Sequence, residues 1–188
     1  MSLQATTWQT VGPYFRIGLA HLNRAEMAPA GTPGERVTIE GRVLDGNGNP
    51  VPDAVIEVWQ ANAAGEYASG SDMTLDADSS KFSGFGRIPT DDRGHFRFTT
   101  VRPGLVPDSD GKPQAAHLAV RIMMRGLLRD LVTRMYFPNE TIGTDPILQS
   151  VPEHRRGTLI AAHAPDDERT LLWNIELQGE RETVFFDC

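Results

Sequence analysis

His117 stands at the start of the apolar stretch AAHLAVRIMMRG, residues 115–126. A histidine in such a place can bind a metal, act as a base or hold a hydrogen bond in the core. A strand that chelates a metal with two imidazoles places them two residues apart, because side chains alternate between faces. Position 119 is an alanine, and the other histidines are scattered at 21, 95, 154 and 163. We therefore expect His117 to be a hydrogen-bonded structural residue.

Arg125 ends the same stretch, next to Gly126. Taken alone, the residues favour a solvated surface arginine, and the alternative is a clamp for a carboxylate, since the guanidinium stays charged and offers a planar fork of donors. Near the N-terminus, TVGPYF at residues 10–15 is stiff and aromatic. Gly12 permits a close backbone approach and Pro13 fixes its own φ. Such a segment should dock, either on this chain's own sheet or in a partner's cleft.

Two acidic stretches could suggest cation binding, and both have a simpler interpretation. DGNGN at residues 45–49 resembles the start of a calcium loop, but Pro50 and Ile56 occupy the sixth and twelfth positions. Those positions need glycine and a bidentate glutamate, so a hairpin turn fits better. The second cluster has no histidine nearby and is expected to be a solvated surface: Asp72, Asp76 and Asp78.

The composition is that of a globular protein and disfavours several functions. The 188 residues are 39% hydrophobic and 23% charged, which is enough to bury a core in one domain. A net charge of −7 argues against nucleic acid or anionic membranes as partners. Residues 1–10 lack the basic and apolar regions of a signal peptide. The single cysteine, Cys188, can form no intrachain disulfide, so we expect a cytoplasmic protein.

Short runs of alternating apolar and polar residues predict an all-β sandwich with long connecting loops. In VTIEGRV, for example, Val37, Ile39 and Val43 alternate with polar side chains. The expected strands are 37–43, 54–60, 95–101, 117–124, 131–137, 171–177 and 182–187.

The remaining stretches predict one or two short helices, a long loop and an arm. Ser150-Val151-Pro152-Glu153 has the pattern of a capping box, and the helix is short because Gly157 and the strand-like TLIAA follow. Residues 61–93 are polar with little periodicity and predict a long connection that is either functional or an interaction surface. We expect a single domain over residues 1–188, with an extended arm at 1–36 and the core at 37–188.

Several of these stretches resemble the intradiol ring-cleaving dioxygenases. They are TVGPYF at 10–15, GRVLDGNGNPVPDAVIEVWQANAAGEY at 41–67, FGRIPTDDRGHFRFTTVRPG at 85–104, TRMYF at 133–137 and the ending GERETVFFDC. The resemblance covers nearly the whole chain and implies a β-sandwich, in agreement with the strands. The catechol and hydroxyquinol enzymes of the family carry a helical N-terminal dimerisation region. Residues 1–36 hold no long amphipathic helix, so the resemblance is to the type built from two homologous chains.

The resemblance implies a ferric ligand shell that this chain lacks. Catalytic members hold a non-haem Fe(III) with two histidines, in an HxH strand, and two tyrosines. Here the HxH stretch reads His117-Leu118-Ala119, one expected tyrosine falls at Met73 or Thr74, and the other meets Leu105-Val106. The chain's three tyrosines match none of the ligand positions: Tyr14, Tyr67 and Tyr136.

The resemblance therefore implies a non-catalytic alpha-type subunit, inactive alone, with no metal ligand and no catalytic residue of its own. Its partner would be a homologous beta-type chain that holds the Fe(III), in an assembly of alpha-beta units. That assembly would cleave 3,4-dihydroxybenzoate with O₂ between its hydroxylated carbons, giving 3-carboxy-cis,cis-muconate in the β-ketoadipate pathway of aromatic catabolism. By the family pattern, the residues that line the partner's substrate cleft are Thr10, Gly12, Pro13 and Arg125.

Two other functions stay open. One is a dioxygenase with an altered metal shell, using His117 with Asp72, Asp76 or another carboxylate. The other is a stand-alone β-sandwich binding module without an enzymatic partner. The sequence fixes neither the number of alpha-beta units nor whether Arg125 contacts the substrate carboxylate.

Overall fold

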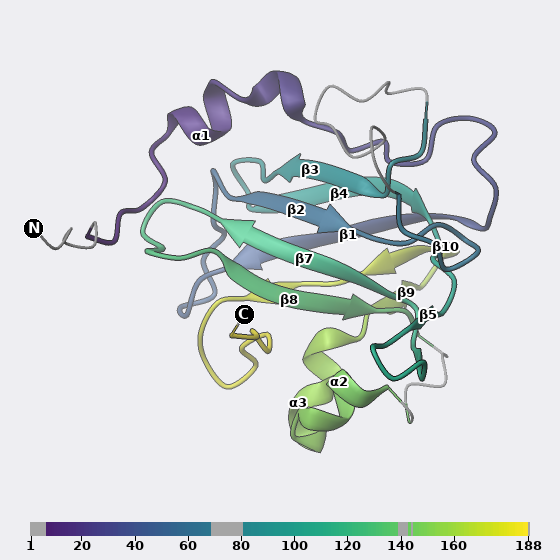
Figure 1. Cartoon of the computed structure of the whole chain (residues 1–188). Helices are drawn as coiled ribbons and strands as arrows, with labels where there is room; N and C mark the ends of the chain where they lie inside the picture. The colour runs from purple at the N-terminus through teal and green to yellow at the C-terminus, as the bar shows by residue number, and fades with distance from the viewer. Residues whose placement is uncertain (1–6, 69–80, 139–142, 144, 188) are drawn as a thin grey trace, which may run out of the picture.

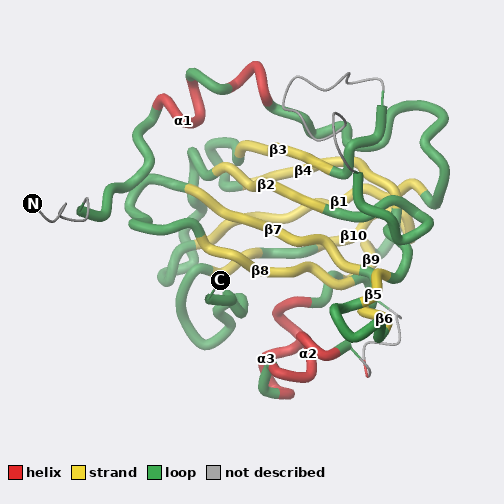
Figure 2. The backbone as a smooth tube through the Cα atoms, viewed as in Figure 1, coloured by secondary structure: helices red, strands yellow, loops and turns green. Residues whose placement is uncertain are grey.

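Two β-sheets stacked face to face form the body of the molecule (Figure 1, Figure 2). The structure is a computed structural model and describes residues 7–68, 81–138, 143 and 145–187. Strands whose side chains alternate can bury one face against a second sheet and leave the other face to solvent or to covering segments. The predicted all-β sandwich is confirmed.

The first sheet is built around β1 (Arg36–Leu44). Along one edge β1 pairs antiparallel with β4 (His95–Val101). Along the other edge it pairs parallel with β10 (Asp167–Leu172) and then with β11 (Ile175–Glu176). β9 (Ala162–Ala164) extends the sheet by pairing antiparallel with β10.

The second sheet has the order β3-β2-β7-β8 and is antiparallel throughout. Its strands are β2 (Val55–Trp59), β3 (Phe85–Pro89), β7 (His117–Met123) and β8 (Leu131–Tyr136). Because β2 and β7 run in opposite directions, the start of β2 lies beside the end of β7. This register matters for the site, since loops at that end of the sheet come together.

The main core fills the space between the two sheets. In β7, for example, Leu118, Val120 and Ile122 are buried, whereas Ala119 and Arg121 on the other face are not. A second, smaller cluster lies where the helices cover the end of β8. It consists of Ala115, Tyr136, Leu148, Val151 and Leu159.

The N-terminal arm crosses the edge of the second sheet (Figure 1). It contains the short helix α1 (Tyr14–Ile17) and the 3₁₀ turn η1 (Ala20–Leu22). After η1 the arm is bonded to the body by bridges from Arg24 to β3 and from Glu26 to β4. Met27 is fully buried in the core. The latter half of the arm is thus part of the folded body.

The predicted capping box at Ser150 is wrong. The helices here are α2 (Pro146–Ser150) and α3 (Glu153–Arg156), followed by the 3₁₀ turn η4 (Gly157–Leu159). The side chain of Asp145 caps α2 by accepting from Leu148 N, whereas Ser150 donates to Ile147 O at the end of α2. α3 has Pro152 at its N-cap and no side-chain cap. A serine hydroxyl can either accept from a backbone N–H of the next helix or donate to a carbonyl of the helix before it, and Ser150 does the latter.

Four strand predictions also need correction. β3 lies inside the stretch predicted as a long loop, and the hairpin of β5 (Val106–Pro107) and β6 (Pro113–Gln114) was missed. The predicted strand 171–177 is broken between β10 and β11, where Arg42 N donates to the Asn174 side chain. Residues 182–187 form only an isolated bridge, Phe186 to Val132.

The DGNGN segment is a turn, as predicted. Asp45 Oδ1 accepts from Asn47 N and Asn49 N, which closes the connection between β1 and the segment leading to β2. Backbone and side-chain hydrogen bonds from Asn49 are the main reason that the pKa of Asp45 is lowered. The described part of the chain contains no helix long and apolar enough to cross a bilayer.

Candidate functional site

The arm is fastened to the turn between β7 and β8 by Thr10. Its Oγ1 accepts a hydrogen bond of 2.7 Å from Gly126 N and donates one of 3.4 Å to Met124 O. Gly126 has a φ of 94°, a conformation that favours glycine, so the turn can present its N–H to the threonine. On the far side of this contact, the Arg129 guanidinium lies 4.1 Å from the centre of the Trp8 ring. The docking predicted for this segment therefore occurs on the chain's own second sheet.

A small pocket of about 120 Å³ lies between the arm and the end of the second sheet. Of the four residues singled out by the sequence, three line this pocket and Thr10 is hydrogen-bonded beside it. The lining residues are Val11, Gly12, Pro13, Phe15, Arg16, Ile17, Asp53 and Arg125. The fold thus brings together residues 10–13 and Arg125, which are more than 100 positions apart in the sequence.

Strand register explains why the charged groups meet here. Val55, at the start of β2, pairs with Met123 at the end of β7. Asp53 precedes Val55 by two residues and Arg125 follows Met123 by two, so the two side chains project from one end of the sheet. Their charged atoms, Asp53 Oδ2 and Arg125 Nη2, are 4.0 Å apart.

Arg16 and Asp53 are pocket residues that the sequence did not single out. Arg16 donates to Asp53 Oδ1 at 2.7 Å and to Thr90 O at 3.1 Å, so it ties α1 to the ends of two strands. Asp53 has a φ of 66°, the only positive φ among the described residues other than glycine. Only the β2–β7 register could have indicated Asp53, because no local pattern links residue 53 to residue 125. No sequence signal pointed to Arg16, which lies on α1.

His117 lies at the opposite end of β7 and is buried, with 4% of its surface exposed. Its Nδ1 is 2.8 Å from Ala115 O, and its ring centre is 5.9 Å from that of Tyr136. Burial, and then the positive charge of Arg134, lower the pKa of His117. The imidazole is therefore a neutral, hydrogen-bonded core residue, as the lone histidine predicted.

Tyr136 is also held in this cluster. Its hydroxyl donates to Asp145 Oδ1 at 3.0 Å, and Asp145 accepts further bonds from Ala115 N and Leu148 N. Burial and the nearby Asp145 carboxylate raise the pKa of Tyr136 far above its usual range. The phenol therefore stays protonated, unlike a tyrosinate ligand.

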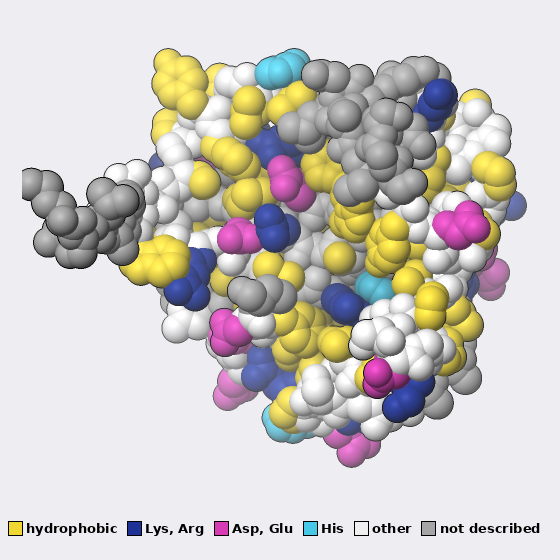
Figure 3. Space-filling view, viewed as in Figure 1, with side chains coloured by type: hydrophobic (Ala, Val, Ile, Leu, Met, Phe, Trp, Pro, Cys, Tyr) yellow, Lys and Arg dark blue, Asp and Glu magenta, His cyan; other side chains and the backbone are white. Residues whose placement is uncertain are grey.

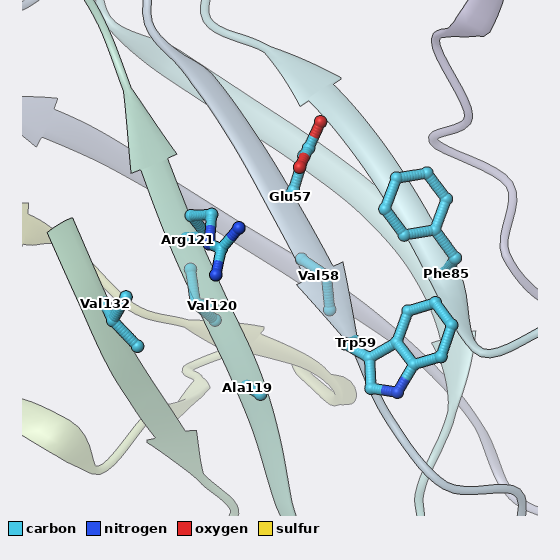
Figure 4. Close-up of a pocket in the computed structure, with 8 residues that line it drawn as sticks. All are labelled: Glu57, Val58, Trp59, Phe85, Ala119, Val120, Arg121 and Val132. Carbon is cyan, nitrogen blue, oxygen red and sulfur yellow. The ribbon is translucent and has the colours of Figure 1, made fainter. Parts of the chain in front are cut away.

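A larger hollow of about 310 Å³ opens on the outer face of the second sheet, where the side chain of Ala119 is small (Figure 4). Trp59 and Phe85 stand on one side of it, with ring centres 5.9 Å apart. Both charged lining groups are paired, Glu57 with Arg87 at 2.5 Å and Arg121 with Asp130 at 2.8 Å. Figure 3 shows acidic, basic and apolar side chains interspersed over this face. The hollow thus has an apolar wall and no free charge from these two groups.

Comparison with known proteins identifies the family. A family model described as Dioxygenase (Dioxygenase_C) matches residues 10–179. The alpha chain of protocatechuate 3,4-dioxygenase from Pseudomonas putida is 39% identical, over 98% of this chain and 97% of that protein. The chain belongs to the intradiol dioxygenases. Among these dioxygenases, the beta chain of protocatechuate 3,4-dioxygenase from Burkholderia cepacia is 40% identical over 71% of this chain and 58% of its own length.

Solved intradiol dioxygenases share the fold. The 3-chlorocatechol 1,2-dioxygenase of Rhodococcus opacus 1CP superposes with a TM-score of 0.63 at 25% identity, over 80% of this chain and 62% of that chain. The fold and family inferred from the sequence are therefore confirmed. Similarity to both an alpha and a beta chain also suggests an alpha-beta assembly.

Intradiol dioxygenases are typically non-haem iron enzymes, and the residues around His117 offer few donors for such an ion. Across the described ranges, no group of three or more His, Cys, Asp or Glu side chains could hold a metal ion. Nδ1 of His117 is hydrogen-bonded to Ala115 O, Ala119 has no side-chain atom that can ligate a metal, and Tyr136 is a protonated phenol. These donors do not fit a ferric site. The acidic cluster and the stretch expected to carry one tyrosine ligand lie outside the described residues: Asp72, Met73, Thr74, Asp76 and Asp78.

Proposed function

We propose that this chain is the iron-free alpha subunit of a protocatechuate 3,4-dioxygenase. In this proposal a homologous beta chain holds the Fe(III), and the alpha chain lends residues 10–13 and Arg125 to the beta chain's substrate cleft. The assembly opens the ring of 3,4-dihydroxybenzoate with O₂ between the hydroxylated carbons, giving 3-carboxy-cis,cis-muconate. We expect the assembly in the cytoplasm, since a chain with one cysteine gains no intrachain disulfide from an oxidising compartment.

The observation that carries the proposal is the separation of two features along β7. His117 begins the strand and Arg125 follows its end, and a seven-residue strand spans roughly 20 Å. The pocket formed by the arm and Arg125 therefore cannot serve chemistry at His117. It lies at the periphery of this chain, where a second chain can reach it.

The exposed side chains around the arm support a docking role. Trp8, Tyr14, Ile17 and Leu128 are large, apolar and 58% to 80% exposed. They lie on the arm and on the β7–β8 turn, and aromatic side chains of this kind are frequent anchors of protein interfaces. A partner that covers them would also close the pocket beside them.

The chemistry that this chain would contribute is electrostatic and steric. The Arg125 side chain is 69% exposed, so its donors can reach a carboxylate beyond the chain's own surface. Gly12 has open space around its Cα, and Pro13 fixes the backbone beside it. A flat aromatic acid could therefore approach the arm's backbone while its carboxylate faces the guanidinium.

Co-expression tests the proposal. The chain purified alone should bind no stoichiometric iron and cleave no catechol, whereas co-expression with its beta chain should give ring cleavage and a visible tyrosinate-to-iron band. Tight iron binding by the isolated chain would instead support an altered metal shell. Failure to form a complex with the beta chain would support a stand-alone binding module.

Arg125→Ala in the assembled enzyme should raise KM for 3,4-dihydroxybenzoate roughly fivefold, because a partly exposed charge pair contributes about 1 kcal/mol. Iron content should not change. Arg169→Ala, an exposed arginine on β10, is the matched control and should leave KM unaltered. An unchanged KM in the Arg125 variant would mean that Arg125 is a solvated surface residue with no role in the substrate cleft.

A further inference from the structure

We propose that Asp53 is a positioning residue that makes this site selective for substrates with a carboxylate. The inference rests on the proposed function and adds a residue to it. Asp53 acts through Arg125 and does not itself touch the substrate.

The geometry of Asp53 is that of a bridge between two guanidinium groups. Its Oδ1 accepts from Arg16 on α1, at 2.7 Å, and its Oδ2 lies 4.0 Å from Arg125 after β7. Arg16 is further held by Thr90 O at the end of β3. One carboxylate thus connects the arm, the start of β2 and the β7–β8 turn, which are the three parts that surround the pocket.

The backbone at Asp53 supports a dedicated role. Its φ of 66° lies in the left-handed region, where asparagine and aspartate are tolerated better than most residues. Glycine would adopt this conformation with less strain but would leave Arg16 without its ion pair. Position 53 therefore requires both a residue that tolerates a positive φ and a side chain that carries a carboxylate.

The charges of the pocket leave one cation in excess. Arg16 and Arg125 contribute two positive charges to its lining and Asp53 contributes one negative charge. Within the described ranges, Arg125 forms an ion pair with Asp53, and at 4.0 Å this pair leaves most of the Arg125 side chain open to solvent. A substrate carboxylate can therefore bind at the free edge of the planar guanidinium, which can donate two parallel hydrogen bonds to its two oxygens.

Without the Asp53 charge, Arg125 would be a mobile surface side chain, since 69% of it is exposed. Ordering such a side chain when substrate binds costs free energy. Only a substrate that uses the guanidinium incurs this cost, so the effect should depend on the substrate's carboxylate.

The experiment compares Asp53→Asn, Arg125→Ala and the double variant in the assembled alpha-beta enzyme. Asparagine tolerates the same backbone conformation and keeps an oxygen for Arg16, but it removes the charge that faces Arg125. Each enzyme is assayed with 3,4-dihydroxybenzoate and with 4-methylcatechol, which lacks the carboxylate. Asp108→Asn, in the turn of the β5–β6 hairpin, is the matched control.

In Asp53→Asn two effects oppose each other: Arg125 loses the carboxylate that orients it, and the substrate carboxylate loses a repulsive neighbour. We expect the loss of orientation to dominate, so that KM for 3,4-dihydroxybenzoate rises about threefold with unchanged kcat and iron content. An unchanged or lower KM would contradict the inference. KM for 4-methylcatechol should stay the same. The double variant should be no worse than Arg125→Ala alone, because Asp53 acts through Arg125.

Two further results would overturn the inference. One is an equal rise in KM for both substrates, which would show a general loosening of the arm. The other is an additive effect in the double variant. If Arg125→Ala itself leaves KM unchanged, both this inference and the assignment of Arg125 fail. If Arg125→Ala raises KM and Asp53→Asn does not, only the inference about Asp53 fails.

Discussion

His117 shows how a side chain in a ligand's place can become structural. Its ring is buried, one nitrogen lies against Ala115 O, and the donor expected two residues later is replaced by Ala119. The sequence predicted this outcome because the i+2 position decides whether a strand can chelate. It could not predict the link from Ala115 through Asp145 to Tyr136, since these residues meet only in the fold.

The lowered pKa of His117 predicts a pH dependence of stability. Burial makes the folded protein take up this proton less readily than the unfolded chain, in which the pKa is about 6.5. As pH falls below about 6.5, the unfolded state gains a proton that the folded state does not, so the free energy of unfolding decreases.

His117→Asn should weaken this dependence while keeping a donor for Ala115 O. Urea unfolding of the isolated chain between pH 7.5 and about 5 gives the free energy of unfolding at each pH. The slope of this free energy against pH is then compared between wild type and variant. His163→Asn, an exposed histidine on β9, is the control. A slope in the His117 variant equal to that of wild type would contradict the assignment of a neutral buried ring.

At the scale of elements, strands that alternate and pair along most of their length were predictable. β1, β4, β7 and β8 agree with their predicted ranges to within one or two residues. β3 was missed because FGRIP is short and follows a polar stretch. Residues 182–187 alternate like a strand, but their backbone bonds go to two different strands, from Thr183 N to Glu176 O in β11 and from Phe186 N to Val132 O in β8, so no continuous ladder forms.

The centre of β1 gives a sharp test of how the first sheet is packed. A Cβ at Gly41 would lie 1.7 Å from Trp173 O and 2.8 Å from Phe96 Cζ. Backbone cannot yield as a flexible side chain can, so Gly41→Ala should destabilise the chain by more than about 3 kcal/mol or prevent folding.

Gly157→Ala is the matched control for Gly41→Ala, because a Cβ at Gly157 would have open space and the backbone φ there is −57°. Its free energy of unfolding should stay within about 0.5 kcal/mol of wild type. Thermal or urea unfolding of both variants gives the comparison. Equal, small effects would mean that β1 does not approach Trp173 as closely as described.

At the scale of the whole molecule, the hydrophobic core and the candidate site lie in different places. The sandwich packs its core between two sheets, whereas residues 10–13 and Arg125 lie at one end of the second sheet, beside exposed aromatic side chains. The four site residues were named from a family resemblance. Their meeting depends on the antiparallel pairing of β2 with β7 and on Arg16 and Asp53, which local sequence patterns do not reveal.

The division of labour between two chains is the central claim, and the iron content of the assembled complex tests it most directly. We predict one ferric ion for each alpha-beta pair, measured by elemental analysis of the purified complex, and none in the alpha chain purified alone. Two irons for each pair, or stoichiometric iron in the isolated alpha chain, would contradict the account.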